Sequence, residues 1–148
     1  DGRLKDTSAN ILANGEFVVH ISDEAMAHKM HACGESFPAD VSELEKVGLT
    51  PVASRTVRPP RIAEAPVAFE CVLSEKLETE SRYVFIGRIG WMAAREGLID
   101  TEAWRVNLRD YHPVGRFGAS FYLRSTDRFA MASTADVAAS TSTAIDQI

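Results

Sequence analysis

Hydrophobic and polar residues follow two periods along the chain, a helical one in its first third and a strand-like one in its later part. Near the start, Asp6 or Thr7 is a suitable N-cap, and Gly15 stands where a helix is expected to stop. We therefore predict a short helix between them. A buried strand over residues 17–21 should follow, because β-branched and aromatic residues are adjacent there.

Two more short helices are predicted before the strand-like period begins. Ser22 can cap a helix over residues 23–33, whose inward side chains would be Ala25, Met26, Met30 and Cys33. Ser42 stands three residues before Glu45, which is the spacing of a capping box, and Gly48 closes this third helix.

Extended structure is predicted for most of the remaining chain. Prolines exclude a helix over residues 49–66. Residues 67–73 and 83–92 then alternate in polarity, which predicts a long antiparallel pair joined by a polar turn over 75–82. We expect a β-bulge, or a close approach by a ligand or another chain, at two glycines of the second strand, Gly87 and Gly90.

The last part of the pattern is less regular. We predict a turn and a short helix over residues 93–110 around Trp104, and then a final strand pair. That pair is expected over 117–123 and 128–131, across a turn at 125–127. Short helices followed by antiparallel strands indicate the α+β class, with a barrel or a strongly bent sheet rather than an open one.

Composition narrows the class of protein further. The 148 residues fit one domain, which we place at 1–131, followed by a low-complexity tail at 132–148. A net charge of −5 argues against a nucleic-acid partner. No apolar run approaches the roughly 18 residues of a membrane span, so we expect no membrane partner. Cys33 and Cys71 match no metal or redox spacing, which favours a reduced, cytoplasmic protein.

The start of the first helix is the strongest candidate for a binding site. A helix N-terminus offers free backbone N–H groups and partial positive charge. The side chains of Arg3 and Lys5 add full charges, and Thr7 and Ser8 add hydroxyl donors. Together they suit a phosphate monoester. The residues alone leave open an ordinary capped helix with solvated basic side chains.

A second candidate site lies in residues 112–118, followed by Tyr122. Gly115 and Gly118 would allow the backbone to approach a flat ligand, Arg116 could face a delocalised anion, and His112 could bind a substrate or transfer a proton. A tight loop with a surface arginine remains the alternative.

A metal site is not expected. His28 and His31 are three residues apart on a predicted helix, a spacing that metal sites use. Nothing in the pattern completes the ligand set, so we interpret both as surface or half-buried histidines.

Three blocks of the sequence, in order, resemble the flavin reductase-like family of the flavoredoxin and nitrilotriacetate monooxygenase reductase type. The first is Lys-Asp-Thr at 5–7 with Asn-Ile at 10–11 and Gly-Glu-Phe-Val-Val at 15–19. The second runs from Phe-Pro at 37–38 to Pro-Val-Ala-Phe-Glu-Cys at 66–71. The third is Tyr-His-Pro-Val-Gly-Arg-Phe-Gly at 111–118 with Tyr122.

The resemblance implies a split β-barrel that binds FMN, or FAD. The flavin would be reduced by NADH or NADPH. It implies a homodimer, a possible partner monooxygenase, and a flavin reductase activity; a non-catalytic FMN-binding electron carrier or sensor is the alternative. The family carries further barrel strands before the first block, so we expect N-terminal strands to be missing from this chain.

The resemblance also assigns expected roles to residues. It implies a flavin phosphate site at the first helix, formed by Arg3, Lys5, Asp6 and Thr7. It implies that the later block lies near the flavin ring or the nicotinamide, with Arg116 and His112 as catalytic candidates and Gly115, Gly118 and Tyr122 as cofactor-binding candidates.

Overall fold

The computed structural model describes residues 4–38, 41–127, 129 and 131. Helix α1 runs from Asp6 to Asn14 and ends at Gly15, which has the left-handed φ of 67° that favours glycine. Its predicted end is therefore confirmed. The predicted cap is wrong: Lys5 holds the N-cap position, and no side chain accepts a hydrogen bond from the first turn. Asp6 and Thr7 are the first helical residues instead.

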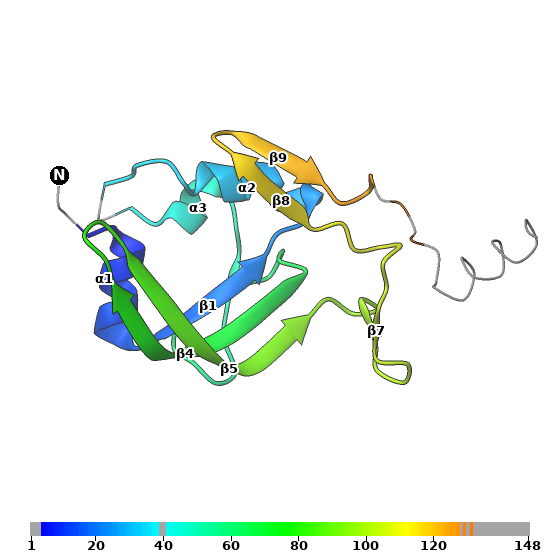
Figure 1. Ribbon diagram of the computed structural model, residues 1–148, viewed down its shortest axis with the longest axis horizontal. Helices are drawn as coiled ribbons and strands as arrows, with labels where there is room; N and C mark the ends of the chain where they lie inside the picture. The colour runs from blue at the N-terminus through cyan, green and yellow to red at the C-terminus, as the bar shows by residue number, and fades with distance from the viewer. Residues whose placement is uncertain (1–3, 39–40, 128, 130, 132–148) are drawn as a thin grey trace, which may run out of the picture.

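A three-stranded antiparallel sheet forms the centre of the molecule, with β4 between β1 and β5 (Figure 1). These strands run over Glu16–Ile21, Val67–Glu78 and Tyr83–Ala94. The predicted pairing is confirmed, but the predicted turn over 75–82 is too long. Residues 75–78 continue β4 because they pair with 83–86, and only Thr79–Arg82 forms the turn.

Both glycines of β5 lie where the pairing register shifts, as the sequence predicts. One shift lies between Glu70 and Cys71, opposite Gly90, and the other lies beside Gly87. A Cβ atom on Gly87 would lie 2.4 Å from the Phe17 ring, so the side chain of Phe17 covers β5 at a point where a larger residue would force a shift.

The second helix is shorter than predicted. A 3₁₀ turn over Glu24–Met26 leads into α2, Ala27–Ala32. The cap is Asp23 rather than Ser22, because the Asp23 carboxylate accepts the N–H of Met26 at 3.2 Å. Met26 is buried as expected, whereas Ala25 is exposed.

The third helix, α3, spans Glu43–Val47 and ends at Gly48, whose φ is 68°. Ser42 is its N-cap residue, but its side chain makes no capping bond, so the predicted capping box does not form. The proline-rich segment that follows is extended, as predicted, and contains the short strands β2, Pro51–Val52, and β3, Arg61–Ile62.

Two hairpins replace the elements that we predicted for the last part. Residues 93–110 contain the strands β6, Ile99–Asp100, and β7, Arg105–Val106, instead of a helix. Trp104 has a φ of 53°, which breaks helical geometry.

The final hairpin is displaced toward the N-terminus of its predicted position. Its strands are β8, Val114–Gly118, and β9, Phe121–Arg124. Gly118 and Ala119 both have positive φ values, 145° and 46°, and therefore make the turn within the stretch that we predicted as a strand. The predicted tail, and much of the predicted strand at 128–131, lie outside the described residues.

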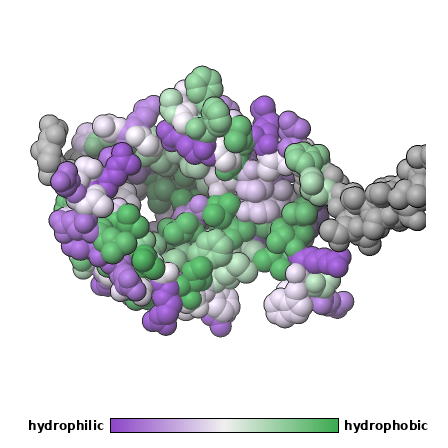
Figure 2. Space-filling model, viewed as in Figure 1, coloured by the Kyte–Doolittle hydropathy of each residue, from purple (hydrophilic) through white to green (hydrophobic). Residues whose placement is uncertain are grey.

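The core is small compared with the apolar surface of the sheet. Buried apolar side chains are Ile11, Met26, Leu49, Val67, Ala68, Cys71 and Leu98. On β4 and β5, by contrast, Leu77, Val84, Ile86 and Ile89 are 43–56% exposed. Figure 2 shows apolar side chains gathered over this part of the molecule. Strands β4 and β5 therefore leave much of their apolar surface exposed instead of burying it in the described core.

Candidate functional site

The first turn of α1 presents its backbone N–H groups without a side-chain cap. Lys5 and Ser8 line a cavity of about 960 Å³ together with the β4–β5 turn, including Arg82. This pocket also holds the carboxylates of Glu78 and Glu80. The helix start therefore combines cationic side chains with free donors. Arg3 lies outside the described residues.

Thr7 faces a different groove. With Asn10 and Asn14, it lines a hollow of about 960 Å³ between α1, β1 and residues 58–62. Ile11, Phe17 and Phe85 supply much of the apolar wall. Lys5 and Thr7 thus lie on different faces of the helix start, as their spacing in a helix dictates, whereas the exposed Asp6 lines a third, smaller pocket beside Thr7.

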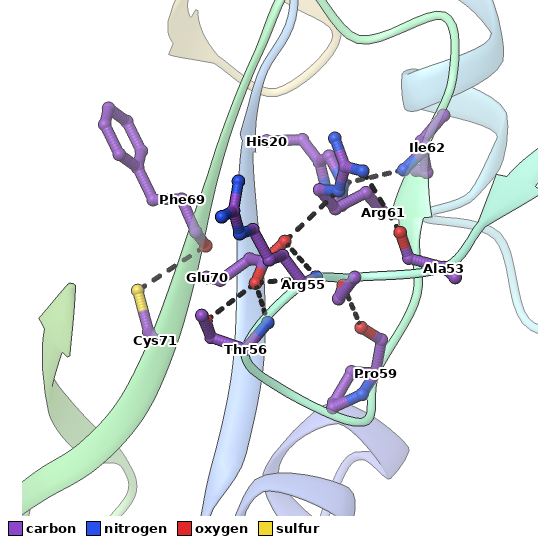
Figure 3. A network of polar contacts seen from close by, with 11 residues as sticks. His20, Ala53, Arg55, Thr56, Pro59, Arg61, Ile62, Phe69, Glu70 and Cys71 are labelled. Carbon is purple, nitrogen blue, oxygen red and sulfur yellow. Dashed lines mark hydrogen bonds and ion pairs between the residues drawn. The ribbon is translucent and has the colours of Figure 1, made fainter. Parts of the chain in front are cut away.

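One wall of this groove is held in place by a buried carboxylate in the central strand (Figure 3). The side chain of Glu70 is fully buried. It accepts the backbone N–H of Arg55 at 2.9 Å and both the N–H and the hydroxyl of Thr56, at 2.6 and 2.7 Å. The guanidinium of Arg61 lies 3.2 Å away.

These contacts decide the charge of Glu70. Burial alone would raise the pKa of Glu70, but the hydrogen bonds from residues 55 and 56, with the nearby cation, hold that pKa below its ordinary value of 4.5. The carboxylate therefore stays ionised and fastens the loop over residues 53–61 to the sheet.

Two more contacts set the shape of the same loop. The imidazole Nε2 of His20 accepts the N–H of Ile62 at 3.0 Å, which requires a neutral ring. Burial lowers the pKa of His20, and the charge of Arg61 lowers it further. On the other side, the Arg55 guanidinium lies 4.0 Å from the centre of the Trp91 ring.

The second predicted site lies on the β8–β9 hairpin, which packs against α2 at the top of Figure 1. The Arg116 guanidinium donates to the Tyr122 hydroxyl at 3.3 Å and to the carbonyl of Ala119. The Tyr122 hydroxyl is also 3.0 Å from Nδ1 of His31, on α2. The hairpin and α2 are thus joined by a chain of three polar side chains.

The remaining predicted residues of the second site, His112, Gly115 and Gly118, lie outside this chain of side-chain contacts. The carbonyl of His112 accepts the N–H of Glu24 at 3.3 Å, while its Nδ1 atom is buried without a hydrogen-bond partner. Gly115 and Gly118 both lie on β8 and are exposed. A side chain on Gly115 would meet only Leu123, at 3.8 Å, so open space lies over the strand there.

The structure therefore groups the predicted residues into two separate regions. Figure 1 shows α1 beside the β4–β5 turn, away from the β8–β9 hairpin. His31, which the sequence offered only as a metal ligand, joins the hairpin group. Within the described residues, no group of three or more His, Cys, Asp or Glu side chains could hold a metal ion. No described helix is long and apolar enough to cross a membrane.

Comparison with known proteins connects this geometry to a family. A family model described as flavin reductase like domain matches residues 2–115. The chain belongs to this family. The three blocks on which the resemblance rests, taken in order, thus identify the family correctly.

Two solved structures of similar sequence share the fold of this chain. The chain is 40% identical to the Pseudomonas fluorescens 2-nitrobenzoate 2-nitroreductase NbaA, with a TM-score of 0.79 over 86% of this chain and 64% of that one. It is 32% identical to nitrilotriacetate monooxygenase component B from Bacillus cereus, with a TM-score of 0.78 over 88% and 66%. The chain thus spans just under two thirds of both relatives.

A more distant structure shows the fold alone. A protein with a split barrel domain from Shewanella frigidimarina NCIMB 400 has 20% identity and a TM-score of 0.72, over 86% of this chain and 64% of that one. The predicted split barrel of the α+β class is confirmed by these likenesses.

Sequence reasoning missed the Glu70 cluster. A signal was present, since one carboxylate stands among the apolar residues of the strand at 67–73. A charge at such a position is rarely buried unless it is paired, and the arginine-rich segment before it holds the candidate partners.

Proposed function

We propose that this protein is a flavin-dependent oxidoreductase that binds FMN, with FAD as the alternative, and reduces it with NADH or NADPH. The observation that supports this best is the groove between α1, β1 and residues 58–62, in a member of the flavin reductase like domain family. It has room for a flat ring system and has an uncapped helix start at one end.

The residues at the helix start fit a phosphate group. Free N–H groups of the first turn, the Lys5 ammonium and the hydroxyls of Thr7 and Ser8 all favour an anion. We propose that the free N–H groups and Thr7, which faces the groove, hold the flavin phosphate, with Lys5, from the neighbouring pocket, and Arg3 as cations. Asp6 would contribute its backbone N–H rather than its carboxylate.

The walls of the groove fit the rest of the cofactor. Ile11 and Phe17 offer apolar surface, whereas the amides of Asn10 and Asn14 can bond polar ring edges. When bound, the flavin would supply the hydride chemistry, and the protein would supply its orientation and electrostatic surroundings.

The hairpin residues are proposed to act on the reacting partner. Although the hairpin lies away from the α1 groove, Arg116 stays our candidate for stabilising negative charge on the reduced flavin, and His112, with its unpartnered Nδ1, stays our candidate for binding or protonating a substrate. Gly115, Gly118 and Tyr122 would allow a ring to approach β8. An Arg116→Ala protein that keeps both its FMN and its hydride-transfer rate would remove Arg116 from this role.

Anaerobic mixing of the FMN-loaded protein with NADH, and separately with NADPH, tests the function. We expect the absorbance of oxidised flavin to disappear with one or both donors. If FMN stays bound but neither donor bleaches it, the protein is instead a non-catalytic electron carrier or sensor. A protein that binds no FMN at all would contradict both functions.

The phosphate assignment has its own test. Lys5→Ala should weaken FMN binding more than riboflavin binding, because only FMN carries the phosphate. Lys46→Ala, which removes an equal charge from the exposed last turn of α3, is the control. Equal losses for FMN and riboflavin would argue against a phosphate contact.

We further propose that the protein is a cytoplasmic homodimer that supplies reduced flavin to a partner monooxygenase. The exposed apolar surface of β4 and β5 supports a dimer, and the name of the Bacillus cereus relative supports an oxygenase partner. The unpaired Cys33 and Cys71 support a reducing compartment. Sedimentation velocity of the purified protein would test the dimer.

A further inference from the structure

A separate pocket lies between α2 and the β8–β9 hairpin, away from the α1 groove (Figure 1). Its volume is about 310 Å³, which suits a small ring rather than a dinucleotide. Its apolar lining includes Val114, Phe121 and Leu123, and its polar lining includes His28, His31 and Arg124. Phe121 is 68% exposed, so its ring is available to pack on a ligand.

The hydrogen bonds around His31 set which of its nitrogens can donate. Arg116 donates to the Tyr122 hydroxyl, and this hydroxyl has one hydrogen of its own. That hydrogen can point to Nδ1 of His31, 3.0 Å away. In this arrangement a neutral His31 carries its hydrogen on Nε2, so the ring has a donor left for a ligand.

The pocket offers hydrogen-bond donors and carries no excess of acidic groups. Glu24 is its one acidic lining residue within the described chain, and its carboxylate is bonded to Arg124 at 2.6 Å. The imidazoles of His28 and His31 are not engaged with an acid in this pocket. An anionic ligand would therefore meet donors from α2 and would face little repulsion.

We propose that this pocket binds a small aromatic carboxylate. The carboxylate would accept the Nε2 hydrogen of His31, and the ring would pack on Phe121 and Leu123. Tyr122 and Arg116 would be positioning residues, because they orient His31 and act through it. The site goes beyond flavin binding at α1, and it can be tested without any flavin.

Titration calorimetry of the purified full chain with benzoate tests the proposal, first without and then with FMN. Benzamide has the same ring without the charge, and acetate has the charge without the ring. We expect saturable binding of benzoate at one site, and binding at least about tenfold weaker for both other compounds, as for the loss of one charge-assisted hydrogen bond or of a buried ring.

Variants separate the proposed contact from general effects. His31→Phe keeps a ring beside Tyr122 but removes the donor, and should weaken benzoate binding about tenfold and benzamide binding less, because the amide oxygen accepts only a weaker, neutral hydrogen bond. His31→Gln restores a donor and should recover part of the affinity. Arg109→Gln, at an exposed position outside the pocket lining, is the charge-matched control for an Arg124→Gln variant, which serves if the His31 variants do not fold.

Three outcomes would overturn the proposal: no saturable benzoate binding, equal affinity for benzoate and benzamide, or wild-type affinity in both His31→Phe and Arg124→Gln. Benzoate competing with FMN one for one would also overturn it, because the ligand would then occupy the flavin groove. Failure to bind FMN, by contrast, would count against the proposed function and leave the benzoate result intact.

Discussion

The molecule contains two polar clusters that differ in burial and in how fully their groups are bonded. Around Glu70, a carboxylate with no exposure meets donors from the backbone and side chains of the preceding loop. Around Tyr122, which is half-buried, the exposed side chains of Arg116 and His31 meet the tyrosine hydroxyl through single hydrogen bonds. The first cluster joins a loop to the sheet, and the second joins a hairpin to α2.

This contrast separates structural from functional use of polar groups. A buried charge is strongly destabilising if it loses its partners, so the bonds of Glu70 hold one geometry. Exposed hydrogen bonds compete with water and contribute little to stability, so the Tyr122 cluster can change partners when a ligand arrives. We therefore expect substitutions at Glu70 to act on stability and substitutions at Tyr122 and His31 to act on binding.

The largest effect is expected from Glu70→Gln. This substitution retains the size of the side chain, but it removes the charge from a site built of donors and leaves Arg61 without its partner. We expect the free energy of unfolding to fall by about 3 kcal/mol, the usual result of breaking a buried ion pair. Urea unfolding followed by circular dichroism measures this change.

A matched control for Glu70 is Glu64, whose carboxylate also accepts hydrogen bonds from a loop, through the N–H and hydroxyl of Thr50. Its bonds are exposed, so Glu64→Gln should cost far less stability. Equal losses of stability in the two variants would show that burial does not determine how much Glu70 contributes to the free energy of unfolding.

One glycine in each region tests whether the sheet is also packed more tightly than the hairpin. Gly87→Ala would place a Cβ atom 2.4 Å from the Phe17 ring, so the ring or the strand must shift. Such overpacking costs typically about 1–3 kcal/mol. Gly115→Ala in the hairpin would meet Leu123 at an ordinary 3.8 Å and should be nearly neutral. Thermal unfolding of both variants decides whether the sheet is the tighter region.

Much of the fold was predictable because it depends on local rules. Gly15 and Gly48 end their helices where a left-handed residue is needed, and the alternation of residues 67–73 and 83–92 predicts the paired strands. The errors arose where the backbone adopts a conformation that the residue type does not predict. Ala119 adopts a φ of 46° to turn the last hairpin, although alanine is not a usual residue for that conformation.

The sequence indicates which residues belong to the candidate site, but it does not indicate how they are grouped in space. The sequence indicated Lys5, Thr7, Arg116 and Tyr122 as polar groups near a ligand, and these roles stay predictions. Their spatial grouping depends on contacts between distant segments. His31 meets Tyr122 across 91 residues of chain, a pairing that no local spacing can reveal.

Acid should loosen the Glu70 region in two steps that belong to different residues. The pKa of His20 is lower in the folded state than its ordinary 6.5, so its contribution is complete above that value and is lost as the pH falls through the folded pKa. The pKa of Glu70 is also lowered, so its contribution is lost at more acidic pH, below 4.5.

Stability measured in urea from pH 8 to pH 3 would resolve these steps. His20→Asn should remove the earlier step, about 1 kcal/mol if one hydrogen bond to Ile62 is at stake, and Glu70→Gln should remove the later one. If both variants retain the full pH dependence of the wild type, other carboxylates are responsible for the acid sensitivity.

Only a small effect on stability is expected from Tyr122→Phe. The ring remains, including its edge contact with His31 at 5.7 Å between centroids, and only the hydroxyl is lost. Because the two hydrogen bonds of that hydroxyl are exposed, the free energy of unfolding should change by less than about 1 kcal/mol. Benzoate affinity should nevertheless fall, since Nδ1 of His31 loses the donor that keeps hydrogen on Nε2. A loss of stability as large as that of Glu70→Gln would mean that the hairpin is locked as firmly as the sheet, and the distinction between the two clusters would then fail.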